Sequence, residues 1–256
     1  MKKLSLLLSL LSFCAFGQEN PKYRRLQLHG GIGRSQLLDQ HFAPMPYKGD
    51  QLHFGLQSFW QRENANQFYI KLSANTGGLV PANSEWLESS EVQFRLSSSY
   101  QWALLKGKSW SWNLGPEYFI EMQLIQWQDE ASLSEAYSYQ QQQCLAMATS
   151  LSYQINAWRL ETALSLGLIS LQSRPPFNGL ADSEEESLFV HLFHDLQVKD
   201  PWNNQNLSGR SAIYYRLSPR VELGALHSWQ INCLVESPEY RRSNQNFSIA
   251  LNFLFR

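Results

Sequence analysis

The stretch QNFSIALNFLFR, residues 245–256 at the end of the chain, decides the fold. Its odd-numbered positions from Phe247 to Phe255 are all apolar, whereas positions 246, 248, 250 and 252 between them are small or polar. Alternation with period two is typical of a β-strand whose two faces meet different surroundings. The same alternation runs from Glu91 to Leu104 and recurs along the chain, so the sequence predicts an all-β protein.

The predicted strands are separated by connections of two kinds. Short turns are expected near 63–65, 106–108, 156–157 and 218–220, and longer loops at about 37–50, 77–90, 126–137, 172–206 and 235–242. Short and long connections alternate without exception, which is typical of an antiparallel up-and-down barrel with an even number of strands. We predict ten strands, with twelve left open, at about 23–36, 51–62, 66–76, 91–105, 109–125, 138–155, 158–171, 207–217, 221–234 and 243–256.

Composition narrows the possible classes of protein. Of the 256 residues 43% are hydrophobic and 17% are charged, against about 25% charged in typical soluble domains. The formal net charge of −1 gives no electrostatic basis for binding nucleic acid. Outside the N-terminus no run reaches the ~18 apolar residues that a membrane helix needs. These values disfavour a nucleic-acid-binding protein and a helical membrane protein.

The N-terminus is typical of a secretory signal peptide. Lys2 and Lys3 form a basic segment, residues 4–16 are apolar, and Ala15 and Gly17 place small residues where signal peptidase cleaves. We predict a signal peptide at residues 1–17 and a single mature domain at 18–256. Only Cys144 and Cys233 then remain, and two cysteines are too few for a disulfide scaffold. They are expected on opposite faces of non-adjacent strands.

Large aromatic residues gather beside the four short turns and at the C-terminus. Outward aromatics at one depth are typical of the girdle of a membrane barrel. We therefore predict an aromatic belt at the short-turn end, comprising Trp60, Phe68, Trp102, Trp110, Trp112, Tyr153, Trp158, Tyr215, Phe253 and Phe255.

The less apolar face of the strands carries ionisable groups. A secreted soluble β-sandwich or barrel is the alternative, but it would turn this face outward and crowd the large aromatics inside. A membrane barrel fits better because it turns the ionisable face inward. The predicted inward charges are Lys71, Arg95, Glu117, Glu121, Arg159, Glu161, Arg210, Arg216 and Glu222.

With these features, the chain from residue 18 to 256 resembles the outer-membrane β-barrel proteins of Gram-negative bacteria. The final strand is similar to their assembly signal, with Ser248, Ala250, Phe253 and Phe255 at the matching positions, although Ala250 replaces the usual Gly and Arg256 follows the last aromatic residue. The resemblance implies residence in the outer membrane, insertion by the barrel-assembly machinery and a lipid-facing outer wall. It identifies no single functional family.

The inward charges are expected to pair with one another. Register across the short turns places Arg216 opposite Glu222 and Arg95 opposite Glu121. A ten-stranded barrel is only slightly wider than barrels filled by side chains. A selective pore would prefer one sign of charge, whereas five cations and four anions are nearly balanced, which favours a structural network over a conducting pore.

The longest loop holds the densest cluster of ionisable and aromatic residues. Ser183 and Glu186 match a capping box, and the apolar residues that follow recur at helical spacing, so we predict a short amphipathic helix there. His191, His194 and Asp195 are candidates for a metal or acid/base site, because His191 and Asp195 are four residues apart. Two ligands do not define a metal centre, and solvated residues on a loop helix are the favoured interpretation. An additional strand at 187–198 would break the even count.

We identify no catalytic constellation, metal site or cofactor site, and the leading hypothesis is a non-enzymatic scaffold or accessory subunit of an outer-membrane complex. A narrow channel and a hydrolase with its site at the extracellular lip remain as alternatives. The expected partners are outer-membrane lipid, the barrel-assembly machinery and another outer-membrane protein, but not nucleic acid.

Overall fold

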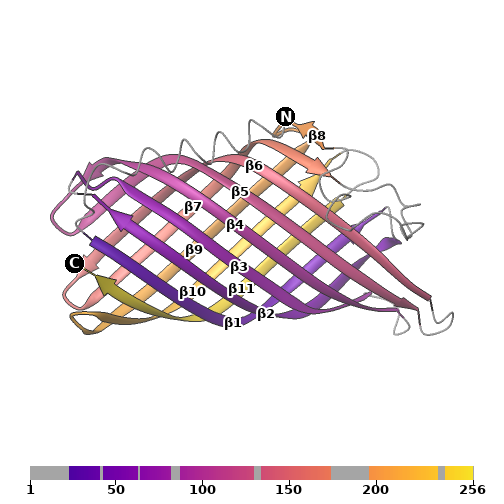
Figure 1. Ribbon diagram of the computed structural model, residues 1–256, viewed down its shortest axis with the longest axis horizontal. Helices are drawn as coiled ribbons and strands as arrows, with labels where there is room; N and C mark the ends of the chain where they lie inside the picture. The colour runs from indigo at the N-terminus through magenta and orange to yellow at the C-terminus, as the bar shows by residue number, and fades with distance from the viewer. Residues whose placement is uncertain are drawn as a thin grey trace.

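The computed structural model describes residues 23–40, 43–62, 64–81, 87–129, 134–173, 196–235 and 240–255. These residues form an all-β antiparallel barrel of ten long strands with one short additional strand (Figure 1). No helix among the described residues is long and apolar enough to cross a membrane. The strands are β1 (Tyr23–Asp39), β2 (Ala43–Gln61), β3 (Gln67–Pro81), β4 (Leu87–Lys106), β5 (Trp110–Asp129), β6 (Ser134–Ile155), β7 (Trp158–Ser173), β8 (Gln197–Lys199), β9 (Asn204–Ser218), β10 (Val221–Leu234) and β11 (Tyr240–Phe255).

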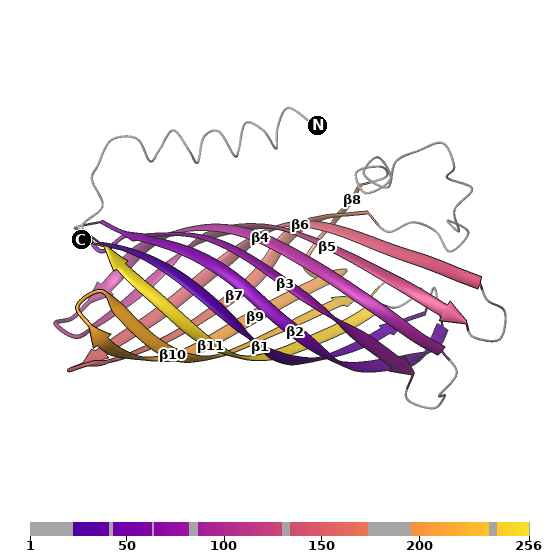
Figure 2. The same cartoon turned by 60° about the horizontal axis from the view of Figure 1, so that its bottom comes forward.

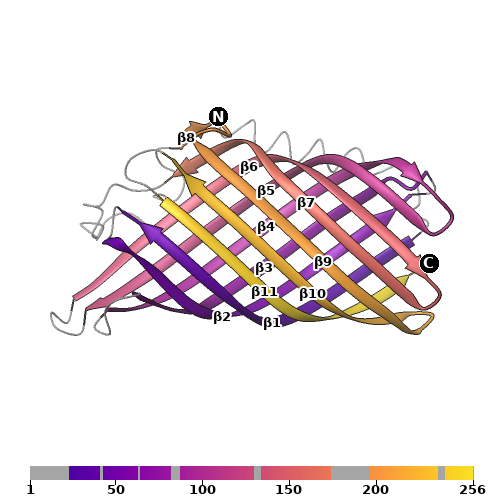
Figure 3. The same ribbon diagram turned by 180° about the vertical axis from the view of Figure 1, so that it is seen from behind.

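The barrel is closed by the pairing of its first and last strands. Each long strand pairs with its neighbours in sequence, and β1 pairs with β11, so that Arg24 lies opposite Phe255. The start of β1 and the end of β11 therefore lie at the short-turn end of the barrel, as Figure 2 shows at the C-terminus. Figure 3 shows the opposite wall, where β7, β9, β10 and β11 lie side by side.

The register of the strands fixes the tilt of the barrel. Following paired residues around all ten strands from Arg24 leads back to Gln36 of the same strand, twelve residues further along. Such a stagger requires the strands to tilt, typically by about 35–45° from the barrel axis. The strong tilt is visible in every view of the ribbon (Figures 1–3).

All ten predicted strands are confirmed, but most extend further than predicted at the long-loop end. The predicted loop at 37–50, for example, is largely strand, since β1 runs to Asp39 and β2 begins at Ala43. Lys48 and Asp50 occupy outward positions there and are exposed. Because these outward residues are polar, the alternation of apolar and polar residues ends there, although the backbone hydrogen bonds between the strands continue.

The predicted loop 172–206 is also shorter than expected. Strand β7 continues to Ser173 and β9 begins at Asn204, while β8 pairs with β7 over Ser170–Gln172. β8 pairs with the same edge of β7 as β9 does, beyond the end of the β7–β9 pairing, so this short strand does not alter the even count. The predicted helix beginning at Ser183, together with residues 174–195, lies outside the described residues.

The distribution of side chains is inverted relative to a soluble protein. On β11 the outward residues Phe247 and Ile249 are 61% and 69% exposed, whereas the inward residues Asn244 and Asn252 are almost fully buried. From Phe247 to Phe255 the outward face of β11 is apolar, which at ~3.4 Å per residue and a tilt of ~40° covers about 21 Å of height. This height is close to the ~25 Å apolar band of membrane barrels.

Candidate functional site: the polar lumen

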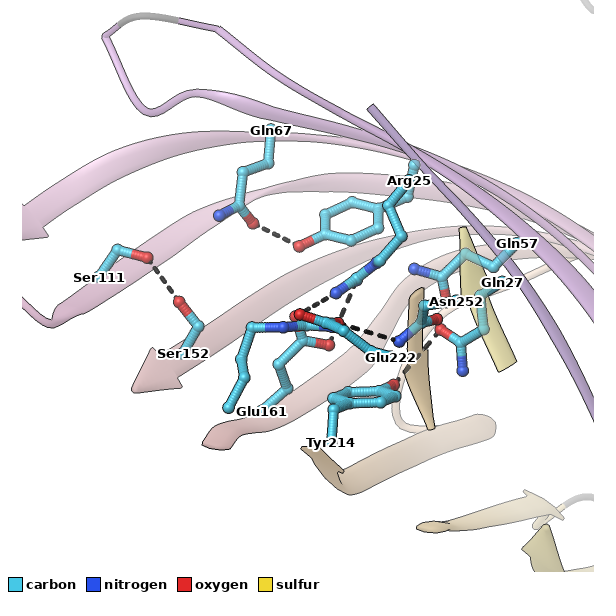
Figure 4. Close-up of polar contacts among 12 residues, drawn as sticks. Arg25, Gln27, Gln57, Gln67, Ser111, Ser152, Glu161, Tyr214, Glu222 and Asn252 are labelled. Atoms are coloured by element: carbon cyan, nitrogen blue, oxygen red, sulfur yellow. Dashed lines mark hydrogen bonds and ion pairs between the residues drawn. The ribbon is translucent and has the colours of Figure 1, made fainter. Parts of the chain in front are cut away.

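The lumen is the candidate site because the inward faces of all ten strands meet there. At the short-turn end, six inward charged residues form what we call the lower cluster: Arg25, Arg159, Glu161, Arg210, Arg216 and Glu222. Glu161 is shared by three guanidinium groups, with Arg25 at 2.7 Å, Arg210 at 3.4 Å and Arg159 in direct contact. Figure 4 shows Arg25 reaching Glu161 from the opposite wall.

The second carboxylate of the lower cluster is Glu222. It contacts Arg159 and lies 3.7 Å from Arg216 on the neighbouring strand. It also accepts a hydrogen bond of 3.3 Å from Asn252 (Figure 4). Arg216 and Glu222 are direct cross-strand partners, which is the register expected from the sequence. Opposite charges in this arrangement stabilise neighbouring strands by about 0.2–1 kcal/mol.

Aromatic rings hold the guanidinium groups of the lower cluster in place. The Tyr214 ring is fully buried and lies 4.2 Å from the Arg159 guanidinium, and Phe59 lies 4.7 Å from that of Arg25. The Tyr214 hydroxyl also donates a 3.3 Å hydrogen bond to Gln27 on β1. A cation over an aromatic face is stabilised without a second carboxylate. These rings therefore help to stabilise arginines that outnumber the carboxylates of the lower cluster.

A middle cluster consists of Arg95, Glu117 and Glu121. Arg95 lies 3.5 Å from Glu121, its cross-strand partner, and 3.9 Å from Glu117. Its guanidinium stacks on Phe119 at 3.8 Å, and Gln230 donates a 2.7 Å hydrogen bond to Glu121 from the other side of the barrel. The middle cluster therefore also joins opposite walls.

An upper cluster surrounds the ion pair of Arg242 on β11 with Glu91 on β4. Both side chains are almost completely buried. Gln51 and Gln123 donate hydrogen bonds of 2.5 and 2.8 Å to Glu91, and Arg242 donates one of 2.8 Å to Gln93. The surrounding amide groups replace the hydrogen bonds with water that both ions lose when they are buried.

Apolar side chains occupy the lumen beyond the upper cluster. We call this group the apolar cap; it comprises Leu37, Tyr47, Leu79, Ile125, Leu234 and Tyr240, at the long-loop ends of their strands. All six are at least nine-tenths buried. The Tyr240 hydroxyl donates a 2.8 Å hydrogen bond to Gln123, which connects the cap to the upper cluster.

A cavity of about 140 Å³ lies in the middle of the lumen. Its charged lining residues are Lys71, Arg95, Glu117, Glu161 and Arg210, and His53 and several serines complete the wall. His53 is packed against His29, with 5.1 Å between ring centroids, and accommodating His29 requires a glycine at position 55 on the next strand. Among the described residues no group of three His, Cys, Asp or Glu side chains could hold a metal ion.

The structure places the residues singled out in the sequence as follows. The nine inward charges lie in the lumen, and the ten aromatic residues lie outward at the short-turn end, where the ring of Trp60 packs against Phe68 and that of Trp158 against Tyr215. Ser248 and Ala250 face the lumen, while Phe253 and Phe255 face outward. The candidate residues His191, His194 and Asp195 lie outside the described residues.

Four inward charges were missed by the sequence analysis: Arg25, Asp39, Glu91 and Arg242. Asp39 fell in a predicted loop. Arg242 fell in a predicted loop and Glu91 at the first residue of a predicted strand, while Arg25 follows Arg24, which faces outward. Odd-even parity along β1 was the signal that could have found Arg25. Neither Cys144 nor Cys233 forms a disulfide in the part of the chain that the structure describes.

Comparison with solved structures identifies the fold. The chain is similar to the outer membrane protease OmpT from Escherichia coli, with a TM-score of 0.55 and 9% identity over 92% of this chain and 98% of that one. It also matches the translocator domain of autotransporter NalP from Neisseria meningitidis (TM-score 0.45, 7% identity, 98% and 95% covered) and Ail of Yersinia pestis (0.40, 8%, 90% and 98%). No protein-family model matches the sequence, and no curated protein is similar to it in sequence.

The closed antiparallel ring, the apolar outer wall and the polar lumen together define a class of protein. The chain is a transmembrane β-barrel with the fold of the outer-membrane proteins of Gram-negative bacteria.

Proposed function

We propose that this protein is a non-conducting barrel of the outer membrane that serves as a scaffold or accessory subunit, offering its outer wall and extracellular loops to another outer-membrane protein. The short turns would face the periplasm and the long loops the exterior. The final strand, with Phe253 and Phe255, would serve as the signal for the barrel-assembly machinery. A shared fold does not carry the proteolytic function of OmpT to this chain.

One observation supports a non-conducting barrel above all others: the side chains meet across the lumen at successive heights. Arg25 reaches Glu161, Gln230 reaches Glu121, and Arg242 reaches Glu91, each from a strand several positions away around the ring. Ions and solutes would have to displace these contacts. The apolar cap adds a second obstacle, because a narrow apolar constriction excludes water and ions.

The sign of the lumen charges gives further support. Conducting pores that select ions carry rings of one sign. Here carboxylates and guanidinium groups alternate in contact with one another from the lower to the upper cluster. Such an arrangement cross-links the walls of a rigid scaffold.

Single-channel recording in planar lipid bilayers tests the proposal. We expect the refolded wild-type barrel to give no discrete current steps, and a Tyr47→Ala/Tyr240→Ala variant to stay closed because the upper cluster still blocks the lumen. Adding Arg242→Ala to this double variant should also leave the lumen closed, because the middle and lower clusters still cross it. Discrete steps from the wild-type protein would favour the narrow channel instead.

The subunit role needs a separate experiment on the native membrane. Extraction in mild detergent should yield a stoichiometric complex with one outer-membrane protein. Recovery of the barrel only as a monomer would contradict the subunit role while leaving the closed lumen unaffected.

A further inference from the structure

The lumen contains more cationic than anionic groups around its central cavity. The lower and middle clusters hold five arginines, Arg25, Arg95, Arg159, Arg210 and Arg216, against the four carboxylates Glu117, Glu121, Glu161 and Glu222. Lys71 adds a further positive charge, and the upper pair of Arg242 with Glu91 is neutral as a whole. An uncompensated charge is costly in an interior that lies within a membrane.

Lys71 is the cation that this arrangement leaves over. Within the part of the chain that the structure describes, it forms no ion pair and no hydrogen bond, although it lines the cavity and lies near enough to Arg95, Arg210 and Glu117 to interact with each electrostatically. The neighbouring carboxylates are already engaged: Glu161 is shared by three arginines, and Glu117 lies beside Arg95. Two of these three interacting groups, Arg95 and Arg210, are also cations.

Unsatisfied polar groups converge on the same place. The Nε2 atom of His53 is buried and has no hydrogen-bond partner, and His53 lines the cavity. Neither ring nitrogen of His29, which packs against His53, has a partner either, and both residues are more than nine-tenths buried. Buried polar atoms without a partner cost about 1–3 kcal/mol each, so a water molecule or a bound ion is expected to satisfy groups of this kind.

We propose that the central cavity is a binding site for one small oxyanion, of the size and charge of inorganic phosphate or sulfate, held by Lys71 and the serine hydroxyls of the cavity wall. A cavity of about 140 Å³ has room for one such ion together with a few water molecules. The bound anion would neutralise the excess charge and accept hydrogen bonds from Lys71 and the serines of the wall. In this way it would complete the structural network of the lumen, whether or not the barrel has a partner.

The test measures binding of inorganic phosphate to the refolded barrel in detergent by calorimetry, at constant ionic strength set with a bulky organic salt. The wild-type protein should bind one phosphate per barrel and show a saturable rise in Tm. Lys71→Met removes the charge and keeps the length of the side chain, and it should weaken binding roughly tenfold or more. Lys108→Met, in an exposed turn, is the matched control and should bind like the wild type.

A second readout does not depend on adding the ion. In buffer free of phosphate and sulfate, Lys71→Met should have a higher Tm than the wild type, because it removes an unpaired charge from the lumen, and phosphate should narrow the difference. Absence of phosphate and sulfate binding to the wild-type barrel at millimolar concentrations would overturn the proposal, as would equal binding by Lys71→Met. If Lys71→Met does not fold, Lys71→Gln provides the same comparison, and the wild-type titration remains decisive. Neither result bears on conductance, which tests the proposed function separately.

Discussion

Arg25 on β1 and Glu161 on β7 meet across the lumen at 2.7 Å, joining two strands that lie on different walls of the barrel. The Arg25 side chain is 1% exposed and that of Glu161 is 13% exposed. Their contact is the clearest sign that the interior of this barrel is a connected polar core, which takes the place of the apolar core of a soluble protein.

The shared carboxylate of Glu161 provides the first prediction. Glu161→Gln leaves Arg25, Arg159 and Arg210 without their common partner, and uncompensated buried charges typically cost about 3–5 kcal/mol. Urea unfolding of the refolded barrel in lipid vesicles should show this loss in the free energy of unfolding. Asp50→Asn breaks an ion pair with Arg34 whose side chains are 69% and 81% exposed, and it should change stability by only ~0–1 kcal/mol. Equal effects would show that the lumen is as well solvated as the surface.

The outer wall provides the second prediction. Ile249 lies at the middle of β11 and is 69% exposed, so Ile249→Arg should place a charge in lipid and cost about 2–4 kcal/mol. Gln245 lies two positions beyond the apolar stretch on the same face, and Gln245→Arg should cost ~0–1 kcal/mol. Unfolding in vesicles measures both. A larger loss in the free energy of unfolding at position 245 than at 249 would show that the apolar band is not centred near Ile249.

Two neighbouring glycines of β1 provide the third prediction. A Cβ on Gly31 would lie 1.9 Å from the carbonyl oxygen of Phe247, whereas a Cβ on Gly30 would meet nothing closer than 3.5 Å. Gly31→Ala should therefore lose ~1–3 kcal/mol of stability through steric displacement of β11. Gly30→Ala should be neutral, or stabilising by up to about 1 kcal/mol, because alanine restricts the unfolded chain. Samples heated to increasing temperatures are run on a denaturing gel, and the fraction that keeps the mobility of the folded barrel ranks the two variants. A reversed ranking would contradict the β1–β11 register.

The predicted aromatic belt can be tested at Trp158. Its ring packs at a tilt against Tyr215 with centroids 4.7 Å apart. We expect Trp158→Ala to reduce the free energy of unfolding in vesicles by about 0.5–1.5 kcal/mol more than the loss of apolar contact area alone would cause. Trp202, 80% exposed at the long-loop end, is the control and should change stability by less than ~0.5 kcal/mol when replaced by alanine. Equal effects of the two substitutions would argue against a belt at the short-turn end.

The sequence predicted the strands because lipid and lumen impose opposite polarity on alternate residues. It underestimated their length where outward residues such as Lys48 and Asp50 leave the apolar band, since the backbone ladder needs no apolar face to continue. Pairs across a short turn, such as Arg216 with Glu222, could be predicted from register alone.

Contacts across the lumen could not be predicted in the same way. Arg242 and Glu91 lie on strands separated by three others, so their meeting depends on the stagger of the whole ring and on the direction of each side chain. The cavity at Lys71 is likewise a property of the closed barrel. Neither carries a local pattern in the sequence.

The inverted polarity of the wall is the central claim, and a cysteine scan of β11 tests it most directly. Single cysteines from position 246 to 253, in a chain whose native cysteines are replaced, would each carry a fluorophore in vesicles containing a lipid-borne quencher. The account predicts strong quenching at the odd positions, including Phe247, Ile249 and Leu251, and weak quenching at the even ones. Strong quenching at the even positions, or no alternation along the strand, would contradict it.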